Sequence, residues 1–224
     1  MRRPWVAVLL MVCGMPWVLA QDATSHPFPR FEVFGGYSPI ETNNHVFHFR
    51  HPNFNFSNTD FDEGGYGFEA GATRNLSKYL GMMGDFSANF SRDRGPVNFT
   101  LACAQPPCPV VTQSSEINPR LYQLLVGPQL KWRNRSRVTP FVHTLFGVAH
   151  STATFSSNGS AVNLVRTDTD TGFAMKASAG VEIRIFRHLG IRTGLNYGRA
   201  YVGSDALAHQ RVNQDGWSIG LVFH

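Results

Sequence analysis

Charged side chains recur on one face of several stretches in which residue types alternate, and such groups could carry protons or ions. Buried ionisable groups are costly and often mark a transport path. They also pair into salt bridges that fill a narrow interior, and we favour this interpretation because a small closed sheet leaves room only for side chains. The set comprises Glu69, Asp85, Lys176, Glu182, Arg184 and Arg192, with Glu32 and Lys131 nearer the ends.

Three histidines, His45, His48 and His51, follow one another at a spacing of three residues. Imidazole is a common ligand of zinc and copper, but tight binding requires ligands that further contacts hold in place. In an extended chain His45 and His48 point to opposite sides. We therefore favour a hairpin that turns at His51-Pro52-Asn53 over a metal site.

Two cysteines, Cys103 and Cys108, are spaced C-A-Q-P-P-C. Two thiols are too few for an ordinary structural zinc site, and the export signal described below places the chain in an oxidising compartment. We predict a disulfide between them. It would close a small loop around Pro106-Pro107 and contribute about 2 kcal/mol.

A catalytic group of nucleophile, base and carboxylate could form around His143, His150 and Ser151, which share one predicted strand. The sequence has no Gly-x-Ser-x-Gly elbow and no other compact nucleophile motif. We therefore expect a non-enzymatic protein with no catalytic residue, no metal and no cofactor.

These side chains lie on stretches that alternate with a period of two, which predicts strands. From Gly172 to Ile185 one face is apolar throughout, whereas the other is small or charged. Exposing Lys176 or Arg184 to lipid would cost about 2–4 kcal/mol each near the midplane, so a slip of one residue is disfavoured. Similar alternation covers 31–39, 66–73, 80–90, 122–133, 138–150, 189–198 and 216–223, which gives eight strands.

The stretch 138–150 alternates less clearly than the others. Its pattern leaves open which of two sets faces the apolar side: Val142, Phe146 and Val148, or Phe141, His143 and Leu145. A membrane-embedded hairpin at 45–57 would raise the strand count to ten.

The connections between these stretches are short and long in turn. Short ones lie at 75–78, 134–136 and 186–188, and long ones at 40–65, 93–119, 155–171 and 202–213. All short turns thus fall at one end of an up-and-down meander, which is typical of outer-membrane barrels. Glycine and serine between charges of both signs on the polar face also favour lipid outside and a filled interior.

Aromatic residues gather near the strand ends on the apolar face, as two interfacial girdles would require. They are Tyr66, Phe90, Tyr122, Trp132, Phe173, Tyr201, Trp217 and Phe223.

The amino-terminal residues have the form of a secretory signal. Arg2 and Arg3 precede an apolar run that ends at Ala20, and it is too short to span a bilayer. We expect a signal peptide over 1–20, a periplasmic segment over 21–30 and a barrel domain over 31–224. The whole chain carries 20 basic and 15 acidic residues, a net charge of +5; removal of Arg2 and Arg3 leaves 18 against 15, or +3. A nucleic-acid partner therefore has little support.

The leader, the eight stretches, the opening Phe31-Glu32-Val33-Phe34-Gly35-Gly36-Tyr37-Ser38 and the closing Gly216-Trp217-Ser218-Ile219-Gly220-Leu221-Val222-Phe223 carry a resemblance. The chain resembles small outer-membrane β-barrel proteins related to the OmpA transmembrane domain and the opacity-type porins. This resemblance implies an all-β, eight-stranded antiparallel up-and-down transmembrane barrel in the Gram-negative outer membrane, with short periplasmic turns and long extracellular loops. Such proteins usually end on the aromatic residue, whereas here His224 follows Phe223.

The favoured function is non-enzymatic, either structural support or surface interaction through the long loops. The expected partners are outer-membrane lipid and lipopolysaccharide, together with an extracellular ligand at loops 41–65 and 93–119, and the barrel is expected to be a monomer. A lipid-modifying outer-membrane enzyme and a narrow small-solute channel are the alternatives.

Overall fold

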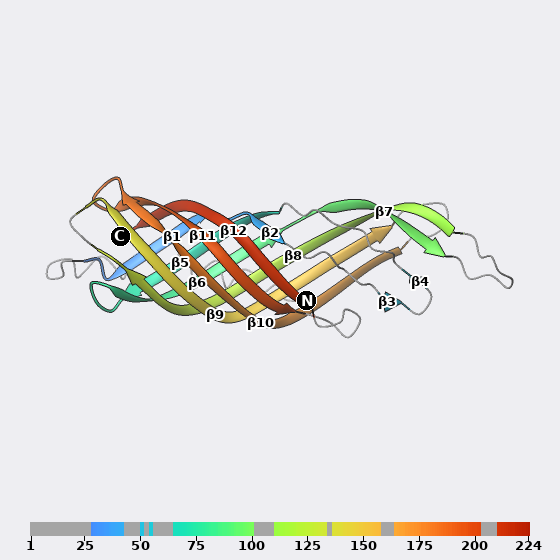
Figure 1. The fold of residues 1–224 in the computed structure, drawn as a ribbon, viewed down its shortest axis with the longest axis horizontal. Coiled ribbons are helices and arrows are strands. Elements are labelled where there is room, and N and C mark those ends of the chain that lie inside the picture. The colour runs from blue at the N-terminus through green and yellow to red at the C-terminus, as the bar shows by residue number, and fades with distance from the viewer. Residues whose placement is uncertain are drawn as a thin grey trace, which may run out of the picture.

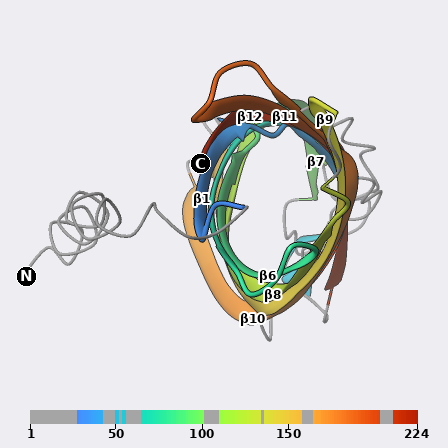
Figure 2. The ribbon, with the colours of Figure 1, turned by 90° about the vertical axis from the view of Figure 1, so that its left-hand side faces the viewer.

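The computed structural model describes residues 28–42, 50–51, 54–55, 65–100, 110–133, 136–157, 164–202 and 210–224. Within these ranges no helix is long and apolar enough to cross a membrane. The chain folds into strands that wind around one elongated interior (Figures 1 and 2).

Eight strands form a closed antiparallel barrel, which confirms the fold class expected from the alternating stretches. Each pairs with the next in chain order, and the last strand returns to the first. Figure 2 shows the closed ring from one end. The strands are β1 (Phe31–Tyr37), β5 (Tyr66–Asn75), β6 (Leu80–Phe90), β8 (Val110–Lys131), β9 (Val138–Ser157), β10 (Leu164–Arg184), β11 (Leu189–Val202) and β12 (Gln210–Phe223).

The described residues also contain four short strands outside the barrel. β2 (Ile40–Thr42) adds to the edge of β12, and β7 (Asp93–Thr100) pairs with β8. β3 (Arg50–His51) and β4 (Phe54–Asn55) pair with each other in a separate two-stranded sheet. Because β3 and β4 lie outside the barrel sheet, the hairpin considered for 45–57 does not add two strands to it, and the barrel has eight strands and not ten.

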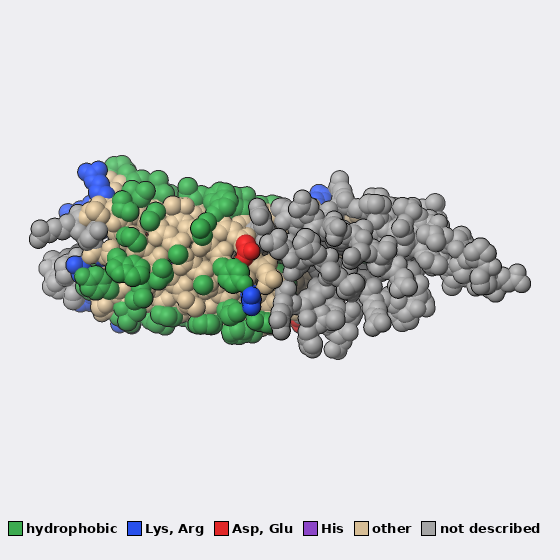
Figure 3. All heavy atoms as spheres, in the orientation of Figure 1, with side chains coloured by type: hydrophobic (Ala, Val, Ile, Leu, Met, Phe, Trp, Pro, Cys, Tyr) green, Lys and Arg blue, Asp and Glu red, His purple; other side chains and the backbone are tan. Residues whose placement is uncertain are grey.

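Side chains alternate between the outer surface and the interior, as β5 shows without a break. The outer surface carries exposed apolar residues such as Phe68, Leu124 and Leu195. Figure 3 shows many hydrophobic side chains on the visible face of the barrel. An apolar surface of this kind is what contact with lipid requires.

The ambiguous stretch on β9 places Phe141, His143 and Leu145 inside, where they are at most 4% exposed. Phe141 fits because two glycines face it from β10 and β11. A Cβ atom at Gly180 would lie 2.8 Å from the Phe141 ring, and one at Gly194 would lie 3.2 Å from it. The interior therefore holds a large ring where the facing strands carry no side chain.

The expected long loops are shorter than predicted, because strands continue into them. β7 and the first part of β8 occupy much of 93–119, while β9 and β10 extend into 155–171. β8, β9 and β10 contain 22, 20 and 21 residues. Threonine, serine and valine are frequent in these extensions, and the β-branched threonine and valine favour strands even in a polar sequence.

Candidate functional site

Five ionisable side chains form a cluster at the end of the interior that faces the short turns. Lys131 on β8 bridges Glu32 on β1 and Glu182 on β10, with 2.6 Å between its Nζ atom and Oε2 of Glu182. Arg133 donates to Oε1 of Glu32 at 2.6 Å, and His224 lies 3.1 Å from Glu182. We call this group the lower ion cluster. It ties three separate strands together across the interior.

A second ion cluster lies deeper in the barrel. The Nζ atom of Lys176 on β10 is 3.0 Å from Oε1 of Glu69 on β5 and 2.9 Å from Oδ2 of Asp85 on β6. All three side chains are at least nine-tenths buried. The ammonium group therefore holds together two carboxylates that would otherwise repel each other in a poorly solvated space.

Arg192 lies inside the barrel without forming an ion pair among the described residues. Its guanidinium stands 4.0 Å from the centre of the Phe141 ring and 5.0 Å from that of Phe34. Its Nη2 atom also donates to Nδ1 of His143 at 3.0 Å. Stacking of this kind compensates part of the cost of burying the charge.

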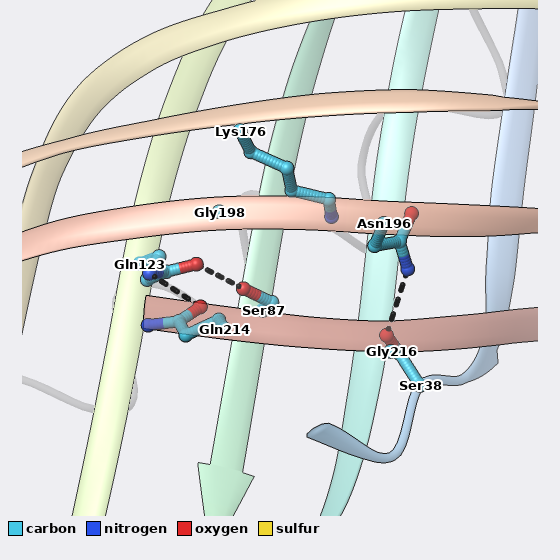
Figure 4. Close-up of a pocket in the computed structure, with 8 residues that line it drawn as sticks. All are labelled: Ser38, Ser87, Gln123, Lys176, Asn196, Gly198, Gln214 and Gly216. Carbon is cyan, nitrogen blue, oxygen red and sulfur yellow. Dashed lines mark hydrogen bonds between the residues drawn. The ribbon is translucent and has the colours of Figure 1, made fainter. Parts of the chain in front are cut away.

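A polar recess lies above the second ion cluster, on the side of the longer strands. Gln123 accepts a bond from Ser87 at 3.2 Å and donates to Gln214 at 3.1 Å, while Asn196 donates to Ser38 at 3.3 Å (Figure 4). The recess is lined by Ser38, Ser87, Gln123, Lys176, Asn196, Gly198, Gln214 and Gly216.

Most of the predicted interior charges do meet inside the barrel, but Arg184 does not. It is exposed as the last residue of β10, where the strand leaves the barrel. The predicted set of interior charges did not include Arg133, His143 and His224. Arg133 does follow the alternation of 122–133 on the polar face, beside Lys131, so the period of two contained a signal for it. The period contained none for His224, which follows the last residue of β12, and it left the direction of His143 open.

Aromatic side chains form a belt around the outer surface. Tyr66 stacks on Phe90 at 5.4 Å and Phe90 meets the edge of Tyr122 at 5.9 Å. Further along, Phe173 lies 6.2 Å from Tyr201, and Trp217 lies 5.9 Å from Tyr37, which the sequence analysis had not included. Trp132 and Phe223 are exposed at the opposite end of their strands.

Beyond this belt, β7, β8, β9 and β10 continue as a four-stranded sheet (Figure 1). We call it the projecting sheet. On β9 and β10 its outward face is mostly polar, with Val165 as an exposed apolar residue. The His150 ring bonds to Thr171 at 2.8 Å, and Thr154 lies 3.3 Å from Thr167. An exposed ion pair joins Arg92 and Glu116 at 2.8 Å.

Glu32, Glu182 and His224 bring ligand atoms close enough to hold a metal ion. However, Lys131 and Arg133 already neutralise both carboxylates from within hydrogen-bond distance. A divalent ion would have to enter beside two fixed cations, so the arrangement favours ion pairing over metal binding.

Some predicted sites fall outside the described residues. These are the signal peptide, the disulfide between Cys103 and Cys108, and the side chains of the histidine series His45, His48 and His51. Each therefore stays a prediction.

Comparison with known proteins agrees with this fold. A family described as outer membrane protein beta-barrel domain matches residues 6–224. The neisserial surface protein NspA is similar in structure, with 12% identity, a TM-score of 0.53 and coverage of 86% of this chain and 96% of that one. Ail of Yersinia pestis, crystallised with the heparin analogue sucrose octasulfate, has 16% identity and a TM-score of 0.49, with coverage of 86% of this chain and 96% of that one. OprG of Pseudomonas aeruginosa has 14% identity and a TM-score of 0.43, with coverage of 86% of this chain and 94% of that one. No curated protein matches the sequence.

Proposed function

The chain belongs to the outer membrane β-barrel family, and from this starting point we propose that it is a non-enzymatic, monomeric surface-interaction protein. The projecting sheet is the part that contacts an extracellular ligand. The barrel below it anchors that sheet in the membrane and keeps it at a fixed orientation.

The length of the strands carries this proposal. A strand needs about 9–11 residues to cross the outer membrane, whereas β8, β9 and β10 contain 20 or more. The surplus lies on the side of the aromatic belt opposite to the short turns. Ordered backbone that is not needed for spanning is costly in conformational entropy, so a binding role is a physical reason for it.

The outward face of the projecting sheet suits a polar ligand. Cross-strand pairs place Thr169 beside Thr152 and Thr167 beside Thr154, and Arg120 of β8 is exposed opposite Thr152. Hydroxyl groups both donate and accept hydrogen bonds, so this face can contact a protein backbone or a polysaccharide.

One edge of the projecting sheet supplies a second mode of contact. Pairing between β10 and β11 begins at Phe173 and Tyr201. Above that point, among the residues that the structure describes, β10 pairs only with β9. An open edge offers a row of backbone donors and acceptors to an extended partner.

A trimmed barrel tests the proposal. In this variant short turns replace 93–117 and 152–169, so that β8, β9 and β10 end just beyond the aromatic belt. We expect the trimmed barrel to fold, with the migration shift on boiling that detergent gels show for folded barrels. Cells that display it should lose adhesion to immobilised extracellular-matrix proteins and polysaccharides, relative to cells that display the full chain.

Ser136→Glu serves as the matched control, because Ser136 lies in a short turn at the opposite end of the barrel. Equal adhesion by the full and trimmed barrels, or equal loss in the control, would contradict the proposal. Lipid A acyl chains should be the same in cells with and without the protein; a changed acyl pattern would identify a lipid-modifying enzyme instead.

A further inference from the structure

Arg199 is a charged residue on the lipid-facing surface of the barrel. On β11 the alternate residues Leu195, Tyr197 and Tyr201 are 72%, 47% and 39% exposed, and Arg199 shares their face. Tyr201 contacts Phe173 in the aromatic belt. Arg199 therefore lies among the belt aromatics, at the height where acyl chains give way to headgroups.

The guanidinium of Arg199 is held in place by its neighbour. Nε and Nη2 donate to the hydroxyl oxygen of Tyr197 at 3.0 and 2.7 Å, and the group lies 5.5 Å from the centre of the Tyr197 ring. The Tyr201 side chain also hydrogen-bonds to this guanidinium. A guanidinium has five N–H donors, so donors remain for an acceptor outside the protein.

Among the described residues no carboxylate forms an ion pair with Arg199. Asp215 stands opposite Tyr197 in the pairing of β11 with β12, yet it does not pair with the guanidinium. The buried cations Lys131 and Lys176 each bridge two carboxylates. Arg199 thus differs from them in having no counter-ion in the part of the chain that the structure describes.

We propose that Arg199, oriented by Tyr197, binds a phosphate group of lipid A in the outer leaflet. Guanidinium matches phosphate in shape and charge, and its bonds to phosphate are stronger than neutral ones. An arginine costs far less near the interface than at the bilayer midplane, so the charge can remain there. The proposal depends on the membrane placement of the barrel and is independent of what the projecting sheet binds.

Retention of lipid A by the refolded protein tests the proposal. Wild type, Arg199→Gln, Tyr197→Phe and the control Arg74→Gln are mixed in detergent with bisphosphorylated lipid A, and bound lipid is measured by native mass spectrometry. Arg74 is also exposed on the outer surface, but it lies at the end of β5 beside a short turn. A gel shift on boiling verifies that each variant is folded.

We expect Arg199→Gln to lower lipid A retention about fivefold, the factor that corresponds to about 1 kcal/mol for one basic residue at a lipid surface. Tyr197→Phe should give a smaller loss, and Arg74→Gln should match wild type. Retention that is unchanged in Arg199→Gln would overturn the proposal. Two further measurements separate the proposal from its alternatives. If inorganic phosphate binds as tightly as lipid A, the site binds free anions and the proposal is wrong. If Asp215→Asn lowers lipid A retention as much as Arg199→Gln does, Arg199 pairs with Asp215 inside the protein and the proposal is wrong.

Discussion

The Nε2 atom of His224 lies 3.1 Å from Oε1 of Glu182, so the residue after the last strand turns its ring into the barrel. Its Nδ1 atom lies 3.7 Å from Oε1 of Glu32. Burial alone would lower the pKa of this imidazole, but its interactions with Glu182 and Glu32 outweigh burial and raise the pKa above the usual 6.5. Protonated His224 therefore stabilises the folded barrel.

We expect His224→Gln to remove a pH-dependent part of the stability. The pKa of His224 is higher in the folded state, so its contribution is complete below the unfolded pKa of 6.5 and is lost as the pH rises through the folded pKa. Urea unfolding of both proteins should show a gap of about 1 kcal/mol in acid that narrows above pH 6.5. A gap that is the same at every pH would contradict the assignment.

Glu182→Ala should destabilise the barrel by about 3 kcal/mol, because it removes one of two carboxylates that neutralise buried Lys131. The temperature at which the folded band converts to the unfolded band on a detergent gel should fall. Arg184→Ala is the control: Arg184 is exposed at the end of β10, and its loss should leave that temperature within error. Equal behaviour of the two variants would show that the lower ion cluster does not stabilise the fold.

The wild-type barrel should show no steady ion conductance in planar bilayers. Phe141 and Arg192 stack within the interior at 4.0 Å, and the two ion clusters also lie inside the barrel. An eight-stranded barrel has an interior that side chains fill. The Glu182→Ala barrel should also stay closed, because the Phe141 ring and the Arg192 guanidinium remain in the interior. A large, lasting open state in the wild type would refute this view and revive the channel alternative.

Gly180→Ala should cost about 1–3 kcal/mol, because the added methyl group has no space. A Cβ atom there would collide with the carbonyl oxygen of Thr193 and would lie 2.6 Å from the Cα atom of Gly194. Gly198→Ala is the matched control, since its nearest neighbour is 3.4 Å away on a side chain. Urea midpoints should separate the two variants. Similar urea midpoints for the two variants would contradict this prediction, because they would mean that the strands beside Gly180 can move apart at little cost.

Cys103 and Cys108 should resist thiol labelling until a reductant is added. The predicted disulfide closes a short loop, so reduction should lower stability by about 2 kcal/mol. Maleimide labelling of unreduced protein, followed by mass spectrometry, measures the free thiols directly. Two labelled cysteines in the unreduced protein would show that the pair is open.

Alternation predicted the barrel well because the two faces of each strand meet different surroundings. Lipid contact requires apolar residues on the outer face, and the narrow interior requires small or paired polar residues on the inner face. It was undecided on β9, where an inward ring, Phe141, resembles an outward one, Phe146. The deciding residues, Gly180 and Gly194, lie on other strands, so no local pattern contains the answer.

The candidate interior site was predictable only in part. Lys176, Glu69 and Asp85 follow the period of their strands, and the structure brings them together. Arg184 follows the same alternation on β10, but it is the last residue of that strand and is exposed. Alternation alone does not indicate the residue at which a strand ends. His224 is outside any strand, so its inward turn depends on the two carboxylates that receive it.

The unequal lengths of the β-ladders give the barrel a weak seam. β1 pairs with β12 over five residue pairs, from Val33 with Phe223 to Tyr37 with Ile219, and β2 adds three more, whereas β9 and β10 share a ladder of twenty. Local opening begins where the fewest bonds must break. Glu32 lies on β1, and its ties to Lys131 and Arg133 cross the lumen to β8 and the residues that follow it. The lower ion cluster thus links β1 to the opposite side of the barrel and stabilises the junction of β1 and β12 from the interior.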